Sequence, residues 1–521
     1  MKNNCVIVVA IDLGTGFCEI AIINEFGKPE VLQNSELEYN TRSVVLIHDD
    51  GKVLVGTQAF NEALLYPGQC FQWIKREMGK DIAMYIDKNG VEYKPQRLAS
   101  YILAKLKMDA EKLLGREITD CVITVPAYFK DPERNATIEA GKLAGFNVLG
   151  LVNEPTASAL AYGMDKEAGK TFLVYDFGAG TFDVSIAKVE KPGEVTIVDT
   201  DGVRNLGGCD IDNLLIQKVY DICEKEHGFQ PDPILDASAC QEIREKAERL
   251  KISLSFKNKS LFICNVRGKQ VSFEITKEEF EDMIKGLIEQ TIVVTKKALE
   301  HAKMSWGDIV DIVLTGGSSS IPLVKKMLKS ESGKTPKGDI KPDQAVAMGA
   351  AIYAAQLAQE AGKNVIDSSG KELYLPKVVL NDIIRHPLGV ILQESVTKIL
   401  LNYVMIKRGS TLPANKVDRF SLSNPGQTEA TIKVVQGEEG ALESQCLLIG
   451  ELKLEDLPMA PNDKDRIEVT YEYDRNGIIH VTAVDLISKK KVSRDLDYTK
   501  GLSQEEIKNQ SQEIKKQVKE E

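Results

Sequence analysis

The sequence predicts a two-lobed α/β domain over residues 1–365, followed by an all-β, sandwich-like module. Three observations support this fold class. A chain of 521 residues is too long for one hydrophobic core. A hairpin motif near the start of the chain recurs later, so that Asp12 in the first copy corresponds to Asp176 in the second. Beyond about residue 389, short alternating apolar and polar runs are separated by turn signals, as in β-sandwiches.

The composition is that of an ordinary globular protein, and it excludes several other classes. Hydrophobic residues make up 43% and charged residues 27%, which argues against disorder or a coiled coil as a global description. The net charge of −11 disfavours attraction to nucleic acid or to an anionic membrane surface. No apolar run approaches the ~20 residues that span a bilayer. We therefore expect neither nucleic acid nor membrane as a partner.

The nine cysteines are dispersed from Cys5 to Cys446 and form no C-x-x-C pair. An odd, scattered set is typical of reduced thiols, not of a disulfide framework or a zinc site. The apolar run Cys5–Ile11 is too short for a convincing secretory signal, is interrupted by Asp12 and precedes no small-residue cleavage site. These features predict a cytoplasmic location.

The two hairpin motifs have the same construction. Val8–Ile22 and Phe172–Ile186 each contain an apolar strand, then the pattern Asp-apolar-Gly-x-Gly, then a second strand with alternating residues. Glycines at such a turn allow positive φ or a close backbone approach. The repeat predicts two similar lobes, each beginning with this hairpin.

The two turns also predict a chemistry. A glycine-rich turn, such as Gly14–Gly16 or Gly178–Gly180, exposes consecutive backbone N–H groups that can surround phosphate oxygens. Asp12 and Asp176 precede these turns and would lie on either side of one polyphosphate, where they could hold a hydrated Mg²⁺. The alternative is two unrelated hairpins with turn glycines and solvated aspartates.

Other well-known nucleotide-binding motifs are incomplete in this sequence. Gly169-Lys170-Thr171 looks like the end of a P-loop, but Met164 stands where the first glycine is needed. Asp183 stands in place of the third glycine of a dinucleotide-binding fingerprint. Any phosphate binding is therefore expected from the hairpins.

Two further segments are candidates for the same cleft. Asp311–Thr315 is a predicted strand, followed by two glycines and a helix start marked by Ser318, and a helix N-terminus favours an anion or a ligand hydroxyl. Glu248, Lys251 and Ser255 are spaced i, i+3, i+7 and share one face of a predicted helix. That face could read a ribose and base, or could be a solvated polar stripe.

With these motifs the chain resembles the 70-kilodalton heat-shock protein chaperone family, whose ATPase domain has the actin-like, duplicated ribonuclease-H-like fold. The resemblance covers the first 360 residues in the family's order and spacing, and it is looser beyond them. In the first part it rests on Ile11–Thr15, Val125–Phe129, Asn153–Ala157, Tyr175–Asp183, Leu206–Gly208, Leu314–Ser318 and Pro342–Ala350. In the second part it rests on Phe420–Leu422, Val435–Glu438 and Asn476–Val481.

The resemblance implies an ATPase with a slow intrinsic rate, using ATP/ADP and Mg²⁺. Asp12 and Asp176 would surround the Mg²⁺, largely through water, and Asp176 could take a proton from the attacking water. Lys75 would lie against the γ-phosphate, and Glu154 would help order the metal's water shell. The resemblance assigns the other contacts to Thr15 and Thr181 as hydroxyl donors, to Gly14, Gly16, Gly178, Ala179, Gly180, Gly207, Gly208, Gly316, Gly317 and Ser318 as the cradle, to Glu248, Lys251 and Ser255 around ribose and adenine, and to Asp343 closing the pocket.

The resemblance also implies a division into domains. Residues 1–365 would form the nucleotide-binding ATPase domain, 366–388 an interdomain linker, and 389–500 a β-sandwich peptide-binding domain. Residues 501–521 would begin a helix, with Ile507, Ile514 and Val518 as a sparse apolar stripe. The family's helical lid would need many more residues, so we expect a short form that lacks it.

A bound peptide would lie extended, adding backbone hydrogen bonds and placing one side chain in an apolar pocket. The candidates for lining this pocket are Val390, Leu392, Phe420 and Ile432. Each of these residues singly could equally belong to the ordinary core of the sandwich.

Five positions depart from the family's pattern. Ser320 stands where an arginine usually stacks on the adenine, and Gly150 stands where a basic residue helps dock the J-domain co-chaperone. Asn381 interrupts the apolar linker, and Ala430 replaces a larger residue of the peptide pocket. Cys209 replaces an acidic residue beside the cradle, as an inert thiol or a redox-sensitive one.

The favoured function is that of an ATP-dependent chaperone of the stress response, which binds extended apolar segments of unfolded polypeptide. In that family, ATP binding lowers peptide affinity and hydrolysis restores it. A nucleotide exchange factor is a further expected partner, whereas Gly150 leaves a J-domain partner open. The alternative is a nucleotide-gated binding or scaffold protein with little or no turnover. Another actin-like ATPase, such as a filament former or sugar kinase, fits less well.

Overall fold

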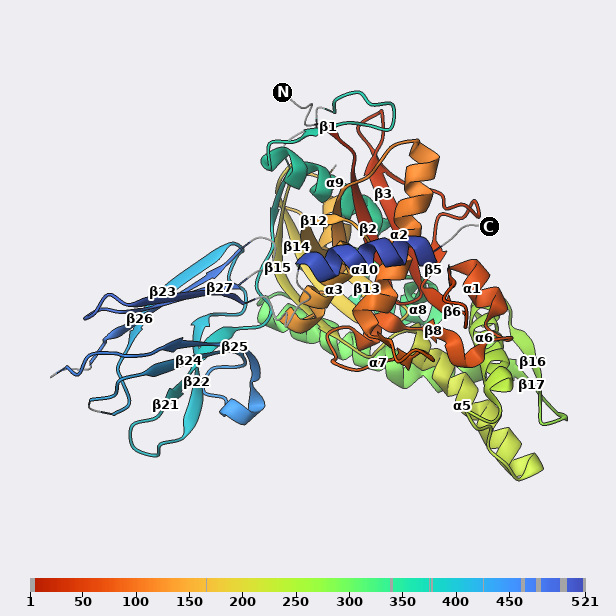
Figure 1. The fold of residues 1–521 in the computed structure, drawn as a ribbon. Helices are drawn as coiled ribbons and strands as arrows, with labels where there is room; N and C mark the ends of the chain where they lie inside the picture. The colour runs from red at the N-terminus through yellow and green to blue at the C-terminus, as the bar shows by residue number, and fades with distance from the viewer. Residues whose placement is uncertain are drawn as a thin grey trace. The chain divides into compact units, whose positions relative to one another are not determined.

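The computed structural model describes residues 5–164, 166–337, 341–373, 375, 378–424, 426–460, 464–474, 479–496 and 504–518. The chain forms two compact units, which Figure 1 shows with their elements labelled. Unit 1 comprises Met1–Tyr128, Ala136–Leu380 and Ser503–Glu521. Unit 2 comprises Phe129–Asn135 and Asn381–Leu502.

The first large sheet of unit 1 contains the first hairpin. Its strands β12 and β11 run parallel to each other and to β2, which pairs antiparallel with β3. The order across the sheet is β12 (Asn147–Asn153), β11 (Asp120–Val125), β2 (Val8–Leu13), β3 (Phe17–Ile23) and β4 (Pro29–Val31), with β5 (Thr41–Arg42) also beside β3. The hairpin strands are buried almost throughout, because apolar side chains occupy both faces.

The second large sheet repeats this arrangement around the second hairpin. Strand β18 runs parallel to β13, which pairs antiparallel with β14, just as β11, β2 and β3 do in the first sheet. The order is β18 (Asp311–Thr315), β13 (Thr171–Phe177), β14 (Phe182–Lys191), β15 (Glu194–Val203) and β20 (Val379–Asn381). The predicted duplication is therefore present as two sheets of matching topology.

Two helices connect these sheets. Helix α9 (Ala345–Glu360) packs on β2, β3 and β11, helix α4 (Glu154–Gly163) packs on β13, β14 and β15, and the two helices contact each other. At their contact Gly349 lies so close to the backbone of Ala157 that a Cβ atom would overlap it. Small residues on both helices permit this approach, so the sheets are joined through a tightly packed helix pair.

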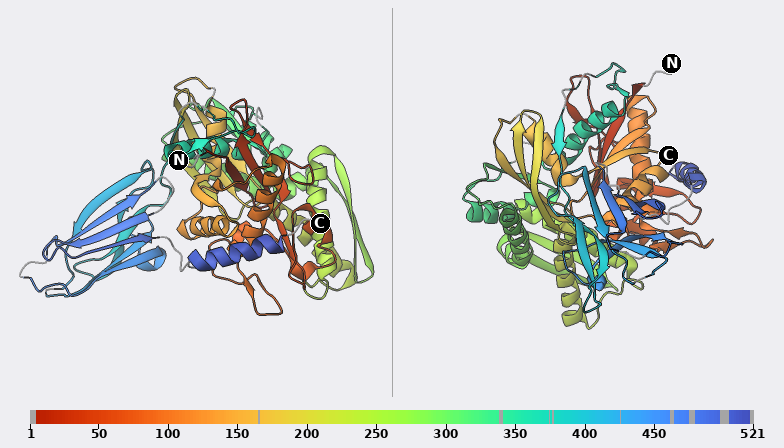
Figure 2. Two further views of the ribbon diagram at one scale, coloured as in Figure 1. Left: turned by 45° about the horizontal axis from the view of Figure 1, so that its top comes forward. Right: turned by 90° about the vertical axis from the view of Figure 1, so that its left-hand side faces the viewer.

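Smaller elements surround this centre, and the two further views in Figure 2 show them around the sheets. Helix α7 (Lys277–His301) begins at a capping box, in which the Thr276 hydroxyl accepts a hydrogen bond from the Glu279 backbone N–H. The strands are β1 (Cys5–Val6), β6 (Val44–Ile47), β7 (Val53–Val55), β8 (Cys70–Gln72), β9 (Tyr85–Ile86), β10 (Glu92–Tyr93), β16 (Lys259–Val266), β17 (Lys269–Thr276) and β19 (Asn364–Val365). The helices are α1 (Thr57–Glu62), α2 (Pro95–Leu114), α3 (Asp131–Leu143), α5 (Gly208–His227), α6 (Ala237–Phe256), α7 (Lys277–His301) and α8 (Pro322–Ser332).

Helix α10 (Gln504–Gln517) belongs to unit 1 and lies against α2. Its predicted stripe faces this unit: Ile514 and Val518 are buried, and Ile507 is half-buried. The Tyr101 hydroxyl donates to Gln517 Oε1 at 2.7 Å, which fixes the end of the helix.

Unit 2 is a sandwich of two antiparallel sheets. One has the order β22 (Leu400–Ile406), β21 (Leu388–Gln393), β24 (Ala430–Gln436) and β25 (Leu447–Leu454). The other has the order β23 (Ala414–Phe420), β26 (Ile467–Tyr473), β27 (Ile479–Asp485) and β28 (Lys491–Leu496). Their inward side chains form one core. The Asn-Gly turn at 476–477 lies outside the described residues, whereas the strands on either side of it, β26 and β27, pair antiparallel.

A buried ion pair lies at one end of the two central strands, β26 and β27, of the second sheet. Arg466 Nε donates to Asp485 Oδ1 at 2.7 Å, and the two side chains are 1% and 0% exposed. Burial alone would raise the pKa of Asp485, but hydrogen bonds from Arg466 and Ser488 outweigh burial and hold this pKa well below its usual range. Breaking a buried pair leaves an uncompensated charge in the interior.

We predict that Asp485→Asn lowers the free energy of unfolding of unit 2 by about 3–5 kcal/mol. The exposed pair Arg419–Glu468, in the same sheet, gives the matched control: Glu468→Gln should cost less than about 1 kcal/mol. Urea unfolding followed by hydrogen exchange in β26 and β27 measures both. Equal costs for the two variants would contradict the prediction.

The ion pair should also make the stability of unit 2 depend on pH. Because the folded pKa of Asp485 is depressed, its contribution to the free energy of unfolding is present above about pH 4 and is lost as the pH falls through the folded pKa.

Candidate functional site

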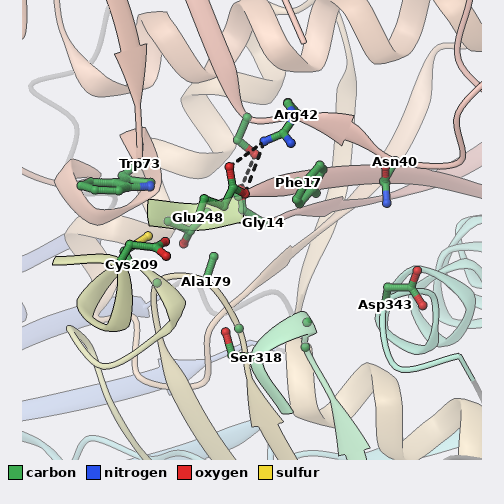
Figure 3. Close-up of a pocket in the computed structure, with 18 of the residues that line it drawn as sticks. Gly14, Phe17, Asn40, Arg42, Trp73, Ala179, Cys209, Glu248, Ser318 and Asp343 are labelled. Atoms are coloured by element: carbon green, nitrogen blue, oxygen red, sulfur yellow. Dashed lines mark hydrogen bonds and ion pairs between the residues drawn. The ribbon is translucent and has the colours of Figure 1, made fainter. Parts of the chain in front are cut away.

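Unit 1 contains a cavity of about 400 Å³ at the point where the two hairpin turns meet. Its walls come from the β2–β3 turn, the β13–β14 turn, the loop after β18 and helix α6, and Figure 3 shows part of this lining. Of the residues predicted for the nucleotide site, the cavity is lined by Asp12, Gly14, Thr15, Gly16, Lys75, Glu154, Asp176, Gly178, Ala179, Gly180, Thr181, Glu248, Lys251, Ser255, Gly316, Gly317, Ser318 and Asp343.

The two turns approach each other so closely that glycine is required. A Cβ atom on Gly180 would overlap the side chain of Thr15, and one on Gly16 would lie 3.0 Å from the Cβ of Ala179. Only the small side chains of Thr15 and Ala179 lie where the turns meet, and both turns border one cavity. This is the arrangement that the repeated motif predicts.

Four charged side chains gather beside the turns. Asp12 lies near the end of β2, Asp176 near the end of β13, and Glu154 is the first residue of α4. Lys75 comes from a 3₁₀ turn, Ile74–Glu77, and its ammonium donates to Glu154 Oε1. The Thr124 hydroxyl donates to Asp12 Oδ1 at 2.7 Å and orients that carboxylate.

Negative charge exceeds positive charge among these groups. Burial raises the pKa of Asp12, although the charge of Lys75 opposes this rise. Burial also raises the pKa of Asp176, and the neighbouring carboxylates of Glu154 and Asp183 raise it further. Burial raises the pKa of Glu154 to about 7. A bound cation would relieve this repulsion.

The residues present fit Mg²⁺. The donors are carboxylate oxygens, which hard cations prefer, and they point into a cavity that has room for phosphates and water. The described residues contain no group of three or more His, Cys, Asp or Glu side chains that could hold a metal ion. Mg²⁺ does not need such a group, since one or two carboxylates, several waters and substrate phosphates usually bind it.

Gly207 and Gly208 lie behind the second turn and not among the lining residues. The Gly208 N–H donates to the Gly178 carbonyl at 3.0 Å, and the Cys209 N–H donates to the Ala179 carbonyl at 2.8 Å. The start of α5 thus fixes the turn from outside the cavity.

The loop after β18 differs in detail from the expected helix start. Gly316 has φ of 77°, and its Cα lies against the backbone of Phe177, so a larger residue would be strained there. Gly317–Ser320 then form a 3₁₀ turn, and the α-helix begins only at Pro322. Ser318 therefore reaches the cavity from the 3₁₀ turn, before α8.

The three residues predicted on one helix face do share a face of α6 and line the cavity. Lys251 Nζ donates to Asp212 Oδ2 at 2.7 Å, and Glu248 accepts from Arg42 at 3.3 Å. Figure 3 shows Arg42 extended toward Glu248. The stripe thus lines the cavity, and its two charged members are paired with other lining residues. Ser320 also lines the cavity.

Sequence reasoning missed several lining or supporting residues. Arg76 donates to the Gly180 carbonyl at 2.8 Å and to Asp210 Oδ1 at 3.1 Å, and so ties the Lys75 segment to the second turn. Only its position next to Lys75 could have suggested this role. The other missed residues that line the cavity include Phe17, Glu19, Asn40, Arg42, Trp73, Asp212, Arg244, Ile252 and Phe256.

Cys209 also lines the cavity and is buried. Burial raises the pKa of its thiol to about 12, so the reactive thiolate is scarce at neutral pH. The inert reading of this cysteine is therefore favoured.

Unit 2 has a separate cavity of about 380 Å³. All four predicted peptide-pocket residues, Val390, Leu392, Phe420 and Ile432, line this cavity, as does Ala430. Val390 and Ile432 are buried members of the sandwich core, while Leu392 and Phe420 are half-buried and pack against it. These four residues thus line a cavity and also belong to the sandwich core or pack against it.

Comparisons with known proteins were made for the whole chain. A family model described as "Hsp70 protein" matches residues 8–521. Proteins named "Chaperone protein DnaK" are similar: that of Thermotoga petrophila is 40% identical over 518 residues, covering 98% of this chain and 83% of the relative. That of Thermosipho africanus is 38% identical over 523 residues, covering 99% and 84%. No described helix is long and apolar enough to cross a membrane.

The family match confirms the predicted fold class, an actin-like two-lobed ATPase domain followed by a β-sandwich. At the level of the family it also confirms the predicted chaperone function, ATPase activity and use of Mg²⁺ with ATP. The chain described here belongs to the Hsp70 protein family.

Proposed function

We propose that unit 1 binds and slowly hydrolyses Mg–ATP, and that this reaction controls the affinity of unit 2 for extended apolar polypeptide. The observation that carries the proposal is the meeting of two matched hairpin turns around one cavity with Asp12, Asp176, Lys75 and Glu154 on its wall. Phosphoryl transfer to water needs positioning and charge neutralisation more than covalent chemistry, and this wall supplies both.

Each group on the wall has a distinct role in this proposal. The backbone N–H groups of the turns and the hydroxyls of Thr15 and Thr181 hold phosphate oxygens. Asp12 and Asp176 would hold Mg²⁺, mainly through water, and the bound ion would supply charge neutralisation at the phosphates. Asp176 accepts a proton from the attacking water at its carboxylate. Lys75 places positive charge near the γ-phosphate, and its contact with Glu154 fixes the ammonium in position.

The nucleoside would occupy the α6 end of the cavity. Glu248, Lys251 and Ser255 face this end, and Asp343 lies at another part of the wall. Ser320 offers no guanidinium to stack on a base, and the neighbouring Arg42 is engaged with Glu248. This feature favours the second candidate, a nucleotide-gated binding protein with little turnover.

In unit 2 the apolar cavity would hold one side chain of an extended peptide, whose backbone would hydrogen-bond to the protein. Unfolded polypeptide in the cytoplasm is the proposed client, and a nucleotide exchange factor is a further proposed partner. Gly150 is buried within β12 and offers no basic side chain, so we propose that any J-domain contact depends on other residues.

We predict that Lys75→Ala lowers the single-turnover rate of ATP hydrolysis by about 10²–10³-fold, because it removes one preorganised positive group. Wild type should hydrolyse ATP slowly and faster with an extended apolar peptide. Lys80→Ala is the matched control, since Lys80 lies on the same segment but is 47% exposed and pairs with Glu77. Turnover unaffected by Lys75→Ala would contradict the assigned site. Absence of turnover in wild type, despite tight ATP binding, would favour the nucleotide-gated alternative.

Restoring a guanidinium at the base end should strengthen nucleotide binding. Ser320→Arg is expected to lower the Kd for ADP by about 2- to 30-fold, the range expected from a cation–π contact of about 0.5–2 kcal/mol. Calorimetric titration measures this change. Inorganic triphosphate, which has no base, is the control ligand and should bind both proteins equally. An equal gain for both ligands would mean that the arginine acts on phosphate charge and not on the base.

The size of residue 430 should affect which peptides bind. Ala430→Met is expected to weaken binding of a peptide with a central leucine by about tenfold or more, because the side chain would fill the cavity. Val417→Met is the control, since Val417 is 47% exposed in the same unit. Fluorescence anisotropy of a labelled peptide gives both affinities. Unchanged affinity in Ala430→Met would remove this cavity as the peptide site.

A further inference from the structure

Glu19 occupies an unusual position in unit 1. It lies on β3 directly opposite Asp12 on β2 in the antiparallel register. Directly opposed residues of an antiparallel pair project to the same face, with their Cβ atoms about 4.5–5.5 Å apart. Both residues line the cavity between the hairpin turns, so two carboxyl groups point into it side by side.

The carboxyl group of Glu19 is buried and incompletely paired. The residue is 3% exposed, and its Oε2 atom receives no hydrogen bond from any described residue. A buried, ionised carboxylate without a hydrogen bond or a counter-charge costs folding free energy. In native proteins such a group usually has a bound ion or an ordered water as its partner. The orphaned oxygen therefore indicates that something else occupies its neighbourhood in the working protein.

The surrounding charges specify what that occupant is. The carboxyl group of Asp12 faces Glu19 across the hairpin, and Glu19 Oε2 has no hydrogen-bond partner among the described residues. The field at this position thus favours additional positive charge. A cation would meet the orphaned oxygen and separate the two facing carboxyl groups.

We propose that Glu19 is a further, outer-shell carboxylate of the divalent-cation site, which reaches the water shell of the Mg²⁺ from the β3 side, opposite Asp12. This inference rests on the proposed function of unit 1 and adds a residue to its cation site. Mg²⁺ retains several waters in proteins, and a carboxylate that accepts hydrogen bonds from those waters orients them. Glu19 is thus a positioning residue for the metal.

The test uses the full chain with Mn²⁺ as probe and ADP as ligand, so it does not depend on turnover. Wild type, Glu19→Gln and Glu245→Gln are compared by Mn²⁺ electron paramagnetic resonance with ADP present, and by ADP titration with EDTA. Glu245 is a control of the same charge: it lines the same cavity from α6, is 9% exposed and accepts from Gln241. Glu19→Gln keeps the size of the side chain and removes its charge.

We expect Glu19→Gln to weaken Mn²⁺ binding by about 10- to 100-fold, the usual effect of losing an outer-shell partner. Glu245→Gln should bind Mn²⁺ like wild type. ADP binding in EDTA should be unchanged or tighter in Glu19→Gln, since a negative charge has gone. Glu19→Asp, which keeps the carboxylate, should retain more Mn²⁺ affinity than Glu19→Gln and so separates charge from packing.

Two results would overturn the inference. If Glu19→Gln binds Mn²⁺ as tightly as wild type while wild type still hydrolyses Mg–ATP, the role of Glu19 is wrong and the proposed function stands. If wild type binds neither Mn²⁺ nor ADP, the proposed function fails together with the inference.

Discussion

The two hairpin turns of unit 1 leave no room for a side chain at Gly16 or Gly180, where they meet, and the rest of the site depends on this contact. Gly180 lies against Thr15, and Gly16 against Ala179. Any larger residue would push the lobes apart and remove backbone N–H groups from the shared cavity. The charged side chains at the ends of β2 and β13 then converge as a consequence of topology, because the strands β11-β2-β3-β4 and β18-β13-β14-β15 have the same order and directions.

The segment that follows β8 stabilises the contact between the two turns through hydrogen bonds and ion pairs. Lys75 contacts Glu154 at the start of α4, while the next residue, Arg76, bonds the Gly180 carbonyl and Asp210. Two adjacent basic residues, Lys75 and Arg76, therefore connect the segment after β8 to α4, to the β13–β14 turn and to α5. Asp210 in turn accepts from the Gly207 N–H, so the start of α5 belongs to the same network. Because Lys75 is paired with Glu154, the carboxylates of Asp12 and Asp176 in the cavity wall have no basic side chain of their own among the described residues.

Much of the fold could be predicted from the sequence, because its signals are local. The repeated Asp-apolar-Gly-x-Gly motif sets strand, turn and strand within fifteen residues, and the alternating runs after residue 389 set the sandwich. The face shared by Glu248, Lys251 and Ser255 followed from helical spacing alone. The resemblance to the family supplied other residues that line the cavity, among them Lys75, Glu154 and Asp343.

What could not be predicted depends on contacts between distant parts of the chain. Arg42 meets Glu248 across more than two hundred residues, and no pattern near either of them signals it. Glu19 is one polar residue in a buried strand, and its importance appears only when β2 and β3 are in register. Likewise, whether Val390 lines a cavity or fills a core depends on how two sheets pack, and here it does both.

The close contact of α4 and α9 at Gly349 has a mechanical consequence. Helix α4 starts with Glu154 and α9 follows Asp343, so each helix carries a carboxylate of the cavity at or next to its N-terminal end. Helices packed this tightly can slide a short way along each other but can hardly separate. Closure of the two sheets around a ligand would therefore require the helices to slide along each other at Gly349, and this sliding would shift Glu154 relative to Asp343 in the cavity wall.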